Sequence, residues 1–319
     1  MVCRQPVVKL DPLQKPGAFV CARPSLLGHF VALAPFVPGF LQFIKLGVPD
    51  VLSLGDYAAL ELRTLHASHA TQLLGPYSRF GWSHPGPAFF YLALPVYEFF
   101  HEHGAALNVF AFICNFVAAI AIVVTASKLR GEVFGLATSL LLGMYETVAA
   151  RFTLSDDWNP MVPVIPIALL TFLSVRLALG SIAVLPWVVF LASAIVQTHV
   201  GYAPPVFFLI GVASLLCARQ LIAKRVWRSA RRRVLSSTLV ALLVTVLVWA
   251  LPVWENFKDQ PGIVPDNLLL LVGTQFKSDR PPRFELTVTD RRHAKNPRER
   301  KGGELISSSG DLFVFLVRR

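Results

Sequence analysis

The sequence contains few charged residues and few cysteines. Only 15% of its 319 residues are charged, compared with about 25% in an average soluble domain, whereas 54% are hydrophobic. This composition excludes an ordinary soluble globular protein and indicates an integral membrane protein. The cysteines have neither the spacing of a metal site nor that of a disulfide framework, so we expect them to be thiols in the protein interior. They are Cys3, Cys21, Cys114 and Cys217.

Acidic residues are scarce as well, with 19 Asp and Glu against 30 Lys and Arg, and the net charge is +11. A strongly basic chain can bind nucleic acid, but here the basic residues gather near the N-terminus, in residues 219–233 and in the C-terminal tail. The preference of basic residues for the cytoplasmic side of membrane proteins accounts for most of them. We therefore expect a lipid bilayer, and no nucleic acid, as a partner.

Seven apolar segments are long enough to cross the roughly 30 Å of hydrocarbon in a bilayer, which takes about 17 to 25 helical residues. They are residues 26–46, 105–127, 133–150, 161–179, 182–199, 203–218 and 234–251. An eighth apolar segment, residues 85–100, reaches only about 24 Å as a helix and contains three prolines. Such a segment is more typical of a helix that lies in the membrane interface.

The positions of the basic residues favour seven crossings over eight. If residues 85–100 do not cross, then the N-terminal segment, Lys128, Arg130 and residues 219–233 all face the cytoplasm. We therefore predict an all-α integral membrane protein with about seven transmembrane helices and a long first extracytoplasmic loop that carries an interfacial helix. The expected parts are a cytoplasmic N-terminal segment (1–25), a transmembrane module (26–252) and a polar basic tail (253–319).

Four polar segments would then share the extracytoplasmic side. They are GD at residues 55–56, GPYSRFGWSHPGPAFFY at 75–91, SDDWNP at 155–160 and QTH at 197–199. Each lies at the end of an apolar run. Polar and aromatic side chains at a membrane boundary commonly face a ligand or a water-filled cavity, so we expect the four segments to form one site.

The order of these segments resembles the C-type glycosyltransferase superfamily, especially bacterial membrane enzymes of the protein-mannosyltransferase and lipopolysaccharide-core sugar transferase kinds. The matching pieces are GD at 55–56 with ELR at 61–63, the motif from Gly75 to Pro87, WNP at 158–160 and, less distinctly, QTH at 197–199. The resemblance covers about residues 26–262. It implies transfer of a hexose or pentose from a polyprenyl-phosphate carrier to a glycan, lipid or protein acceptor, at the outer face of the bacterial inner membrane.

Asp56 is the expected catalytic base. Sugar transfer from a phosphate leaving group needs a base for the proton of the acceptor hydroxyl, and the resemblance implies that the first-loop aspartate has this role. The alternative is that Asp56 caps a helix that begins at Tyr57. Many relatives have a second acid where this chain has Tyr57, so a divalent metal lacks an adjacent acidic pair to support it. No metal-binding residue is predicted.

Two arginines are expected to contact phosphate or sugar, because a guanidinium matches the geometry of a phosphate: Arg79 and Arg151. The alternative for Arg79 is that it reaches to lipid headgroups. The other expected ligand contacts are Tyr77, His84, Asp157, Trp158, Asn159, Gln197 and His199, with Glu61 and Glu146 behind them. Structural roles compete here too, as interfacial aromatics, helix-capping carboxylates and interhelical hydrogen bonds.

Two other functions remain open. A lipid-saccharide or solute transporter would also be a polytopic membrane protein, but transporters often have internal repeats and polar groups near the membrane midplane. This sequence shows no repeat between its halves, and its polar motifs lie on one side. The resembling enzymes continue with further spans, so a truncated, inactive member with an aberrant tail is also consistent with the sequence.

Overall fold

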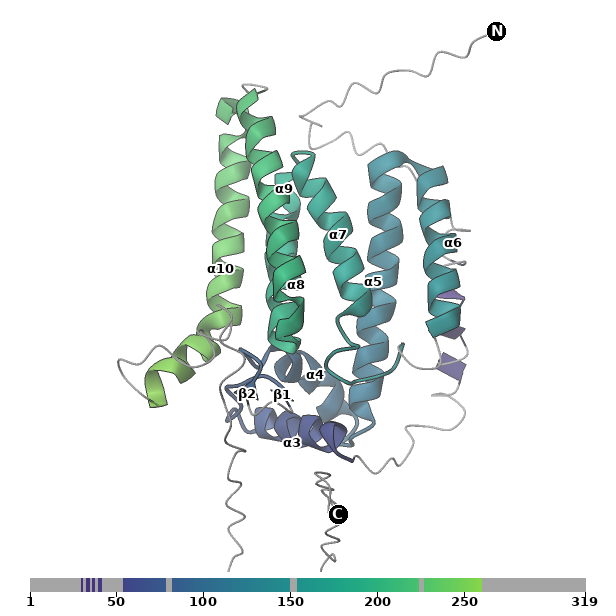
Figure 1. Ribbon diagram of the computed structural model, residues 1–319, viewed down its shortest axis with the longest axis vertical. Helices are drawn as coiled ribbons and strands as arrows, with labels where there is room; N and C mark the ends of the chain where they lie inside the picture. The colour runs from purple at the N-terminus through teal and green to yellow at the C-terminus, as the bar shows by residue number, and fades with distance from the viewer. Residues whose placement is uncertain are drawn as a thin grey trace, which may run out of the picture.

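The computed structural model describes residues 54–78, 82–149, 154–223 and 227–259, together with isolated positions between 30 and 41. From residue 54 onward this part of the chain contains eight α-helices and one short β-hairpin (Figure 1). The expected first span, residues 26–46, lies almost entirely outside the described residues. Also outside the described residues are Arg79, Arg151, the first 25 residues and the tail from residue 260.

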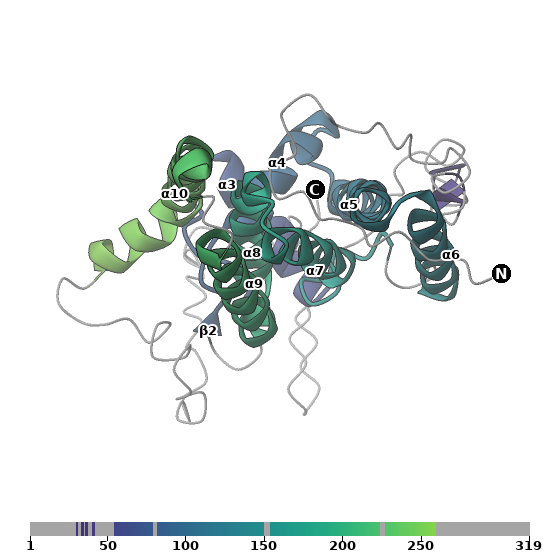
Figure 2. The ribbon, with the colours of Figure 1, turned by 90° about the horizontal axis from the view of Figure 1, so that it is seen from above.

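Six helices run side by side and form a bundle (Figure 1). Seen from above, they follow an arc from α10 through α8 and α9 to α7, α5 and α6 (Figure 2). Two 3₁₀ turns, η1 (Ile182–Val184) and η2 (Val200–Tyr202), lead into α8 and α9. The helices are α5 (Ala106–Arg130), α6 (Glu132–Ala149), α7 (Val164–Ala178), α8 (Leu185–Thr198), α9 (Ala203–Ala223) and α10 (Trp227–Asp259).

Three helical segments are long and apolar enough to cross a membrane: Ala106–Arg130, Val200–Ile222 and Arg231–Glu255. Large apolar side chains cover the outer surfaces of α9 and α10, and Phe208 and Leu247 are 70% and 66% exposed. Extensive exposed apolar surface is unusual for a soluble monomer and is typical of contact with lipid. The chain is therefore a candidate membrane protein.

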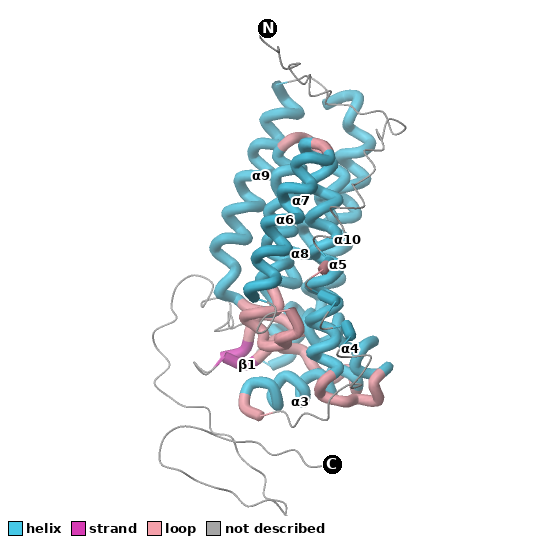
Figure 3. Tube along the Cα trace, turned by 90° about the vertical axis from the view of Figure 1, so that its right-hand side faces the viewer, coloured by secondary structure: helices cyan, strands magenta, loops and turns pink. Residues whose placement is uncertain are grey.

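One end of the bundle is covered by α3 (Asp56–Ser68), α4 (Ala88–Phe99) and the β-hairpin (Figure 3). On α4 the buried residues Phe89, Ala93 and Tyr97 recur every four positions, which places them on one face of the helix. This face belongs to a hydrophobic cluster that also includes residues of α3 and α5. The cluster holds α3 and α4 against the end of α5, where the polar segments lie.

Most expected segments form helices close to their expected positions. The segments 105–127, 133–150, 182–199 and 203–218 correspond to α5, α6, η1 with α8, and α9, and residues 85–100 contain α4. The segment 161–179 is helical only from Val164, because Pro160 and Pro163 restrict the backbone before it. The all-α prediction missed the hairpin at residues 77–83, whose strands have only two residues each.

Helix α10 continues past residue 252, where the transmembrane module was expected to end. Pro252 lies inside the helix, and the helix bends in its C-terminal part (Figure 1). Proline has no N–H group and its ring clashes with the carbonyl four residues earlier, which explains the bend. The carbonyl four residues before Pro252 belongs to Val248, and it needs another hydrogen-bond donor.

Of the four cysteines, Cys114 and Cys217 lie among the described residues, and both are free thiols. Cys217 is 2% exposed and belongs to the hydrophobic cluster formed by α7, α8 and α9. The expectation of interior thiols is therefore confirmed for Cys217, while Cys114 is only partly buried.

Candidate functional site

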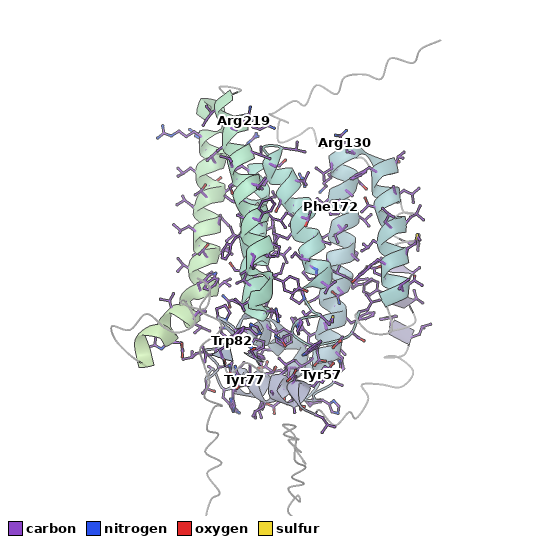
Figure 4. The ribbon with its side chains drawn as sticks, in the orientation of Figure 1. Tyr57, Tyr77, Trp82, Arg130, Phe172 and Arg219 are labelled. Atoms are coloured by element: carbon purple, nitrogen blue, oxygen red, sulfur yellow. The ribbon has the colours of Figure 1, made fainter. Side chains whose placement is uncertain are left out.

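Four polar segments that are far apart in the sequence meet at one end of the bundle. They are the start of α3, the hairpin with its continuation into α4, the loop before α7 and the turn between α8 and α9. Figure 4 shows Tyr57, Tyr77 and Trp82 at this end, and Arg130 and Arg219 at the opposite end. The prediction that the four segments come together is confirmed, and we call them the polar cluster.

The hairpin is formed by β1 (Tyr77–Ser78) and β2 (Trp82–Ser83), which pair antiparallel. Beyond the strands, the Gly75 N–H donates to the His84 carbonyl at 3.0 Å, and the His84 N–H donates to the Pro76 carbonyl at 2.8 Å. These bonds fix the backbone at His84, and they direct its side chain relative to the rest of the polar cluster. The proline- and glycine-rich sequence therefore folds locally into a defined turn.

Replacing Gly75 with alanine is expected to destabilise the protein by about 1 to 3 kcal/mol. The added Cβ would lie 2.6 Å from the carbonyl oxygen of Gly86 and 2.9 Å from that of Gln197, and neither backbone atom can rotate away. Thermal unfolding in detergent measures the effect. Gly211→Ala is the matched control, because nothing lies within 4 Å of a Cβ there. Equal stability of the two variants would contradict a tight junction at Gly75.

The side-chain amide of Gln197 joins two distant elements. Its Oε1 accepts a hydrogen bond from the Ala88 N–H at 3.1 Å, and its Nε2 donates to the Val248 carbonyl at 3.0 Å. This is the carbonyl that Pro252 leaves without a helical partner. Gln197 is fully buried, and its bond to Val248 joins α8 to α10. An interhelical hydrogen bond was the structural alternative to a ligand contact for this residue.

His84 and His199 lie in a row of four aromatic rings. The centroid of the His84 ring is 4.9 Å from that of Trp82 and 4.7 Å from that of His199, and the His199 ring is 5.8 Å from that of Tyr202. His84 is 2% exposed. Desolvation lowers the pKa of His84 to about 3, with smaller contributions from His199 and Arg63. The imidazole of His84 is therefore neutral at neutral pH.

Arg63, in the middle of α3, binds the hairpin segment of the polar cluster and is counted with it from here on, although it was not predicted as a site residue. Its guanidinium donates to the Gly75 carbonyl and, at 3.2 Å, to the Ser83 hydroxyl, and it lies 5.9 Å from the centroid of the Tyr77 ring. Desolvation lowers the pKa of Arg63. A signal was present: Arg63 follows Asp56 by seven residues, which places both on one face of a helix.

Asp56 lies in the first turn of α3, and its side chain points to the loop before α7. Its Oδ2 accepts a hydrogen bond from the Trp158 indole at 3.1 Å. The capping position is occupied by Gly55 with φ 58°, and no side chain caps the helix there. The alternative that Asp56 caps a helix beginning at Tyr57 is therefore wrong, because the helix includes Asp56 itself.

The loop before α7 is held by hydrogen bonds from neighbouring elements. Asn108 of α5 donates to Asp157 Oδ1 at 2.8 Å, and Asn159 donates to the Thr198 carbonyl at 3.2 Å. Asp157 is 4% exposed, and desolvation, assisted by the nearby charges of Asp156 and Glu61, raises its pKa to about 7. The bond from Asn108 opposes this rise.

Asp156 and Asp157 were alternatively expected to cap the next helix. The capping residue of α7 is Pro163 instead, so this alternative is wrong. Asp156 Oδ1 accepts hydrogen bonds from the Tyr57 hydroxyl at 3.2 Å and from the Trp158 backbone N–H at 2.9 Å. The two carboxylates therefore organise the loop around Trp158 rather than the start of the helix.

The two supporting glutamates lie in different places. Glu61 borders the polar cluster: a Cβ at Gly104, in the turn before α5, would lie 2.4 Å from its Oε2. Glu146 is fully buried on α6, and neither carboxylate oxygen has a hydrogen-bond partner among the described residues. Arg151, which follows Glu146 by five residues and could pair with it, lies outside these residues. No hydrogen bond joins Glu146 to the polar cluster within the part of the chain that the structure describes.

Two further residues of the polar cluster were missed. Asn108 holds Asp157, as described above, and the Tyr202 hydroxyl donates to the Pro160 carbonyl at 2.9 Å. Asn108 had a weak signal, since it is a polar residue in the first turn of an apolar helix. Nothing in the sequence indicated which carbonyl Tyr202 would meet.

No set of three or more His, Cys, Asp or Glu side chains that could hold a metal ion occurs among the described residues. The aspartates of the polar cluster are bound instead by the Tyr57 hydroxyl, the Trp158 indole and the Asn108 amide. In the comparisons with known proteins, no family model, no curated protein and no solved structure matches this chain.

Proposed function

We propose that the protein is a membrane glycosyltransferase that moves a sugar from a polyprenyl-phosphate carrier to an acceptor at the extracytoplasmic face. The observation that supports this most is the arrangement of Asp56 and Arg63 on one face of α3, within the polar cluster and beside apolar helices. Seven residues correspond to about 10 Å along a helix, which leaves room for a sugar between a base and a phosphate. The resemblance of the motifs at residues 55–63, 75–87 and 158–160 adds to this.

The proposed membrane orientation places the polar cluster outside. Arg130 and Arg219 lie at the end of the bundle opposite Tyr77 and Trp82 (Figure 4), and basic residues favour the cytoplasmic side. In this orientation α5 to α10 supply six crossings, residues 26–46 a seventh, and α4 lies at the membrane interface. A bacterial inner membrane fits these features.

The proposed reaction is an inverting displacement at the anomeric carbon. The acceptor oxygen forms a bond to sugar C1 while its proton passes to the Asp56 carboxylate. The bond between C1 and the phosphate oxygen breaks, and the electron pair leaves with the phosphate of the lipid carrier. Trp158, which is bound to Asp56, offers an aromatic face for the sugar ring. Cationic and N–H donor groups near the leaving oxygen stabilise the developing charge.

The proposal is tested by incubating the purified full-length protein in liposomes with a panel of radiolabelled polyprenyl-phosphate sugars and bacterial membrane extract. We expect label to move from one donor to an acceptor, and excess polyprenyl phosphate, but not polyprenol, to inhibit the reaction. Empty liposomes are the control. If no donor reacts while the protein moves labelled lipid saccharide or solute across the bilayer, the protein is a transporter and the proposal is wrong.

A further inference from the structure

A half-open apolar groove lies at the end of the bundle opposite the polar cluster. It has a volume of about 260 Å³ and lies where the end of α7, η1 and the start of α8 meet the last turns of α9 and the beginning of α10. An apolar cavity of only about 150 Å³ already takes up an apolar molecule rather than water. The groove therefore suits an apolar ligand. Each of these elements contributes to its lining, through Leu177, Ile182, Leu185, Ala218, Ile222 and Val234.

The groove extends from the interior of the bundle to its outer surface. The lining residues Leu177 and Cys217 are 1% and 2% exposed, whereas Ile222 is 72% exposed. Ile222 ends one of the segments that are long and apolar enough to cross a membrane. A lipid of the surrounding bilayer can therefore enter the groove from the side, without leaving the membrane.

Basic residues lie next to the groove. Arg219 directly follows the lining residue Ala218, and it lies at this end of the bundle (Figure 4). Arg231 precedes the lining residue Val234 by three positions, which is less than one helical turn. Both arginines are exposed, and the segment 219–233 contains no acidic residue. Basic pockets between helices on the cytoplasmic side of a membrane bind negatively charged lipid headgroups.

The charge of the segment 219–233 argues against two other occupants of the groove. The C-terminal tail from residue 260 has more basic than acidic residues, so it does not complement this segment. A second copy of the chain would bring the same basic segment to the same side of the membrane, and like charges repel. An amphiphile with a negative headgroup satisfies both the apolar lining and the arginines.

We propose that the groove binds an acyl chain of an anionic glycerophospholipid from the cytoplasmic leaflet, while Arg219 and Arg231 contact its headgroup. The long side chains of these arginines can extend to the headgroup level. The bound lipid fills the space between the end of α9 and the beginning of α10. The proposal rests on the orientation that places the arginine end of the bundle in the cytoplasm, and it does not require sugar transfer.

Native mass spectrometry of the full-length protein in detergent measures how many lipids bind and how tightly. The probes are phosphatidylglycerol, phosphatidylcholine with the same acyl chains, and glycerol phosphate, which has no acyl chain. We expect one phosphatidylglycerol to bind at least tenfold more tightly than phosphatidylcholine, and glycerol phosphate not to bind. Equal affinities for the two lipids, or binding of glycerol phosphate alone, would overturn the proposal.

Filling the groove tests where the acyl chain lies. Ala218→Trp places a large side chain in the groove and is expected to weaken phosphatidylglycerol binding by at least tenfold. Leu215→Trp is the matched control, because Leu215 is on the same helix, is 70% exposed and does not line the groove. Unchanged binding by Ala218→Trp would contradict the site. Loss of a protein dimer in Ala218→Trp, without loss of lipid, would show that a second copy occupies the groove instead.

Removing single charges tests the headgroup contacts without changing the packing of the groove. Arg219→Gln and Arg231→Gln are each expected to weaken phosphatidylglycerol binding by about fivefold and to leave phosphatidylcholine binding unchanged, because one basic residue near a membrane surface has about this effect. Arg130→Gln is the matched control, since Arg130 is exposed at the same end of the bundle but belongs to α5 (Figure 4). An equal loss in Arg130→Gln would mean that the whole basic surface, and not the groove, attracts the lipid.

A photoreactive group on one acyl chain of phosphatidylglycerol locates the bound lipid directly. Crosslinks are expected in residues 177–185 and 214–222, and excess unlabelled phosphatidylglycerol, but not phosphatidylcholine, should prevent them. Crosslinks confined to the outer surface of α6, where Val148 is 84% exposed, would identify only ordinary bilayer lipid and would reject the groove as a binding site.

Discussion

Replacing Asp56 with asparagine is expected to lower the rate of sugar transfer by about 10²- to 10⁴-fold, which is the usual contribution of a general base. Asparagine still offers an oxygen to the Trp158 indole, which lies 3.1 Å from Asp56 Oδ2, so the side chain should keep its place. The loss would then come from the missing proton acceptor. Donor binding should change little, because the proposed phosphate contacts are two turns away on α3.

The measurement is single-turnover transfer at equal amounts of protein in liposomes. Glu132→Gln is the matched control, because Glu132 is an exposed carboxylate at the start of α6, far from the polar cluster. The control should transfer at the wild-type rate. A fully active Asp56→Asn protein would show that another group takes the proton, and Asp157 would be the next acid to replace.

Replacing Asp157 with asparagine is expected to stabilise the protein at pH 8 by about 2 to 4 kcal/mol, and by much less at pH 4. The folded protein raises the pKa of Asp157 from an ordinary 3.8 to about 7, mainly by desolvation. Between these values the folded state binds more protons than the unfolded state. The wild-type protein therefore loses stability as the pH rises from 4 to 7 and loses no more above pH 7.

Asparagine removes this dependence because it does not ionise, and it keeps an oxygen for the Asn108 side chain, which lies 2.8 Å from Asp157 Oδ1. The melting temperatures of the two proteins in detergent should coincide near pH 4 and separate as the pH rises. Glu132→Gln should follow the wild-type curve. Parallel curves for Asp157→Asn and wild type across this range would mean that Asp157 ionises normally in the folded protein.

The helices could be predicted from the sequence because apolar runs reveal them directly. Segments such as 105–127 and 182–199 correspond to α5 and to η1 with α8, since their length and composition leave few alternatives. The boundaries of two helices differ from the prediction. Helix α7 begins only at Val164, because prolines precede it. Helix α10 extends beyond its apolar residues at both ends, because its polar ends are helical too. The hairpin was missed because strands of two residues show no alternation.

The meeting of the polar segments was predictable, whereas their individual contacts were not. The number of membrane crossings between them already places the start of α3, the hairpin and the loop before α7 at one end of the bundle. The pairing of Trp158 with Asp56, and of His84 with Val200, depends on side-chain directions that only packing determines. Arg63 was missed because a single arginine on an amphipathic helix usually faces solvent.

The Gln197 amide also makes one connection of the polar cluster depend on α10, the last described helix to be synthesised. Val248, which this amide binds, follows Ala88, its other partner, by 160 residues. At about 5 to 20 residues per second, the hairpin leaves the ribosome roughly 8 to 30 s before α10 can complete the connection. During that interval the segment around His84 has its contacts with α3, and then with α8 and the turn after it, but the Gln197 amide lacks its partner on α10. A nascent chain released before Val248 would carry every motif residue of the polar cluster and still lack this hydrogen bond between α8 and α10.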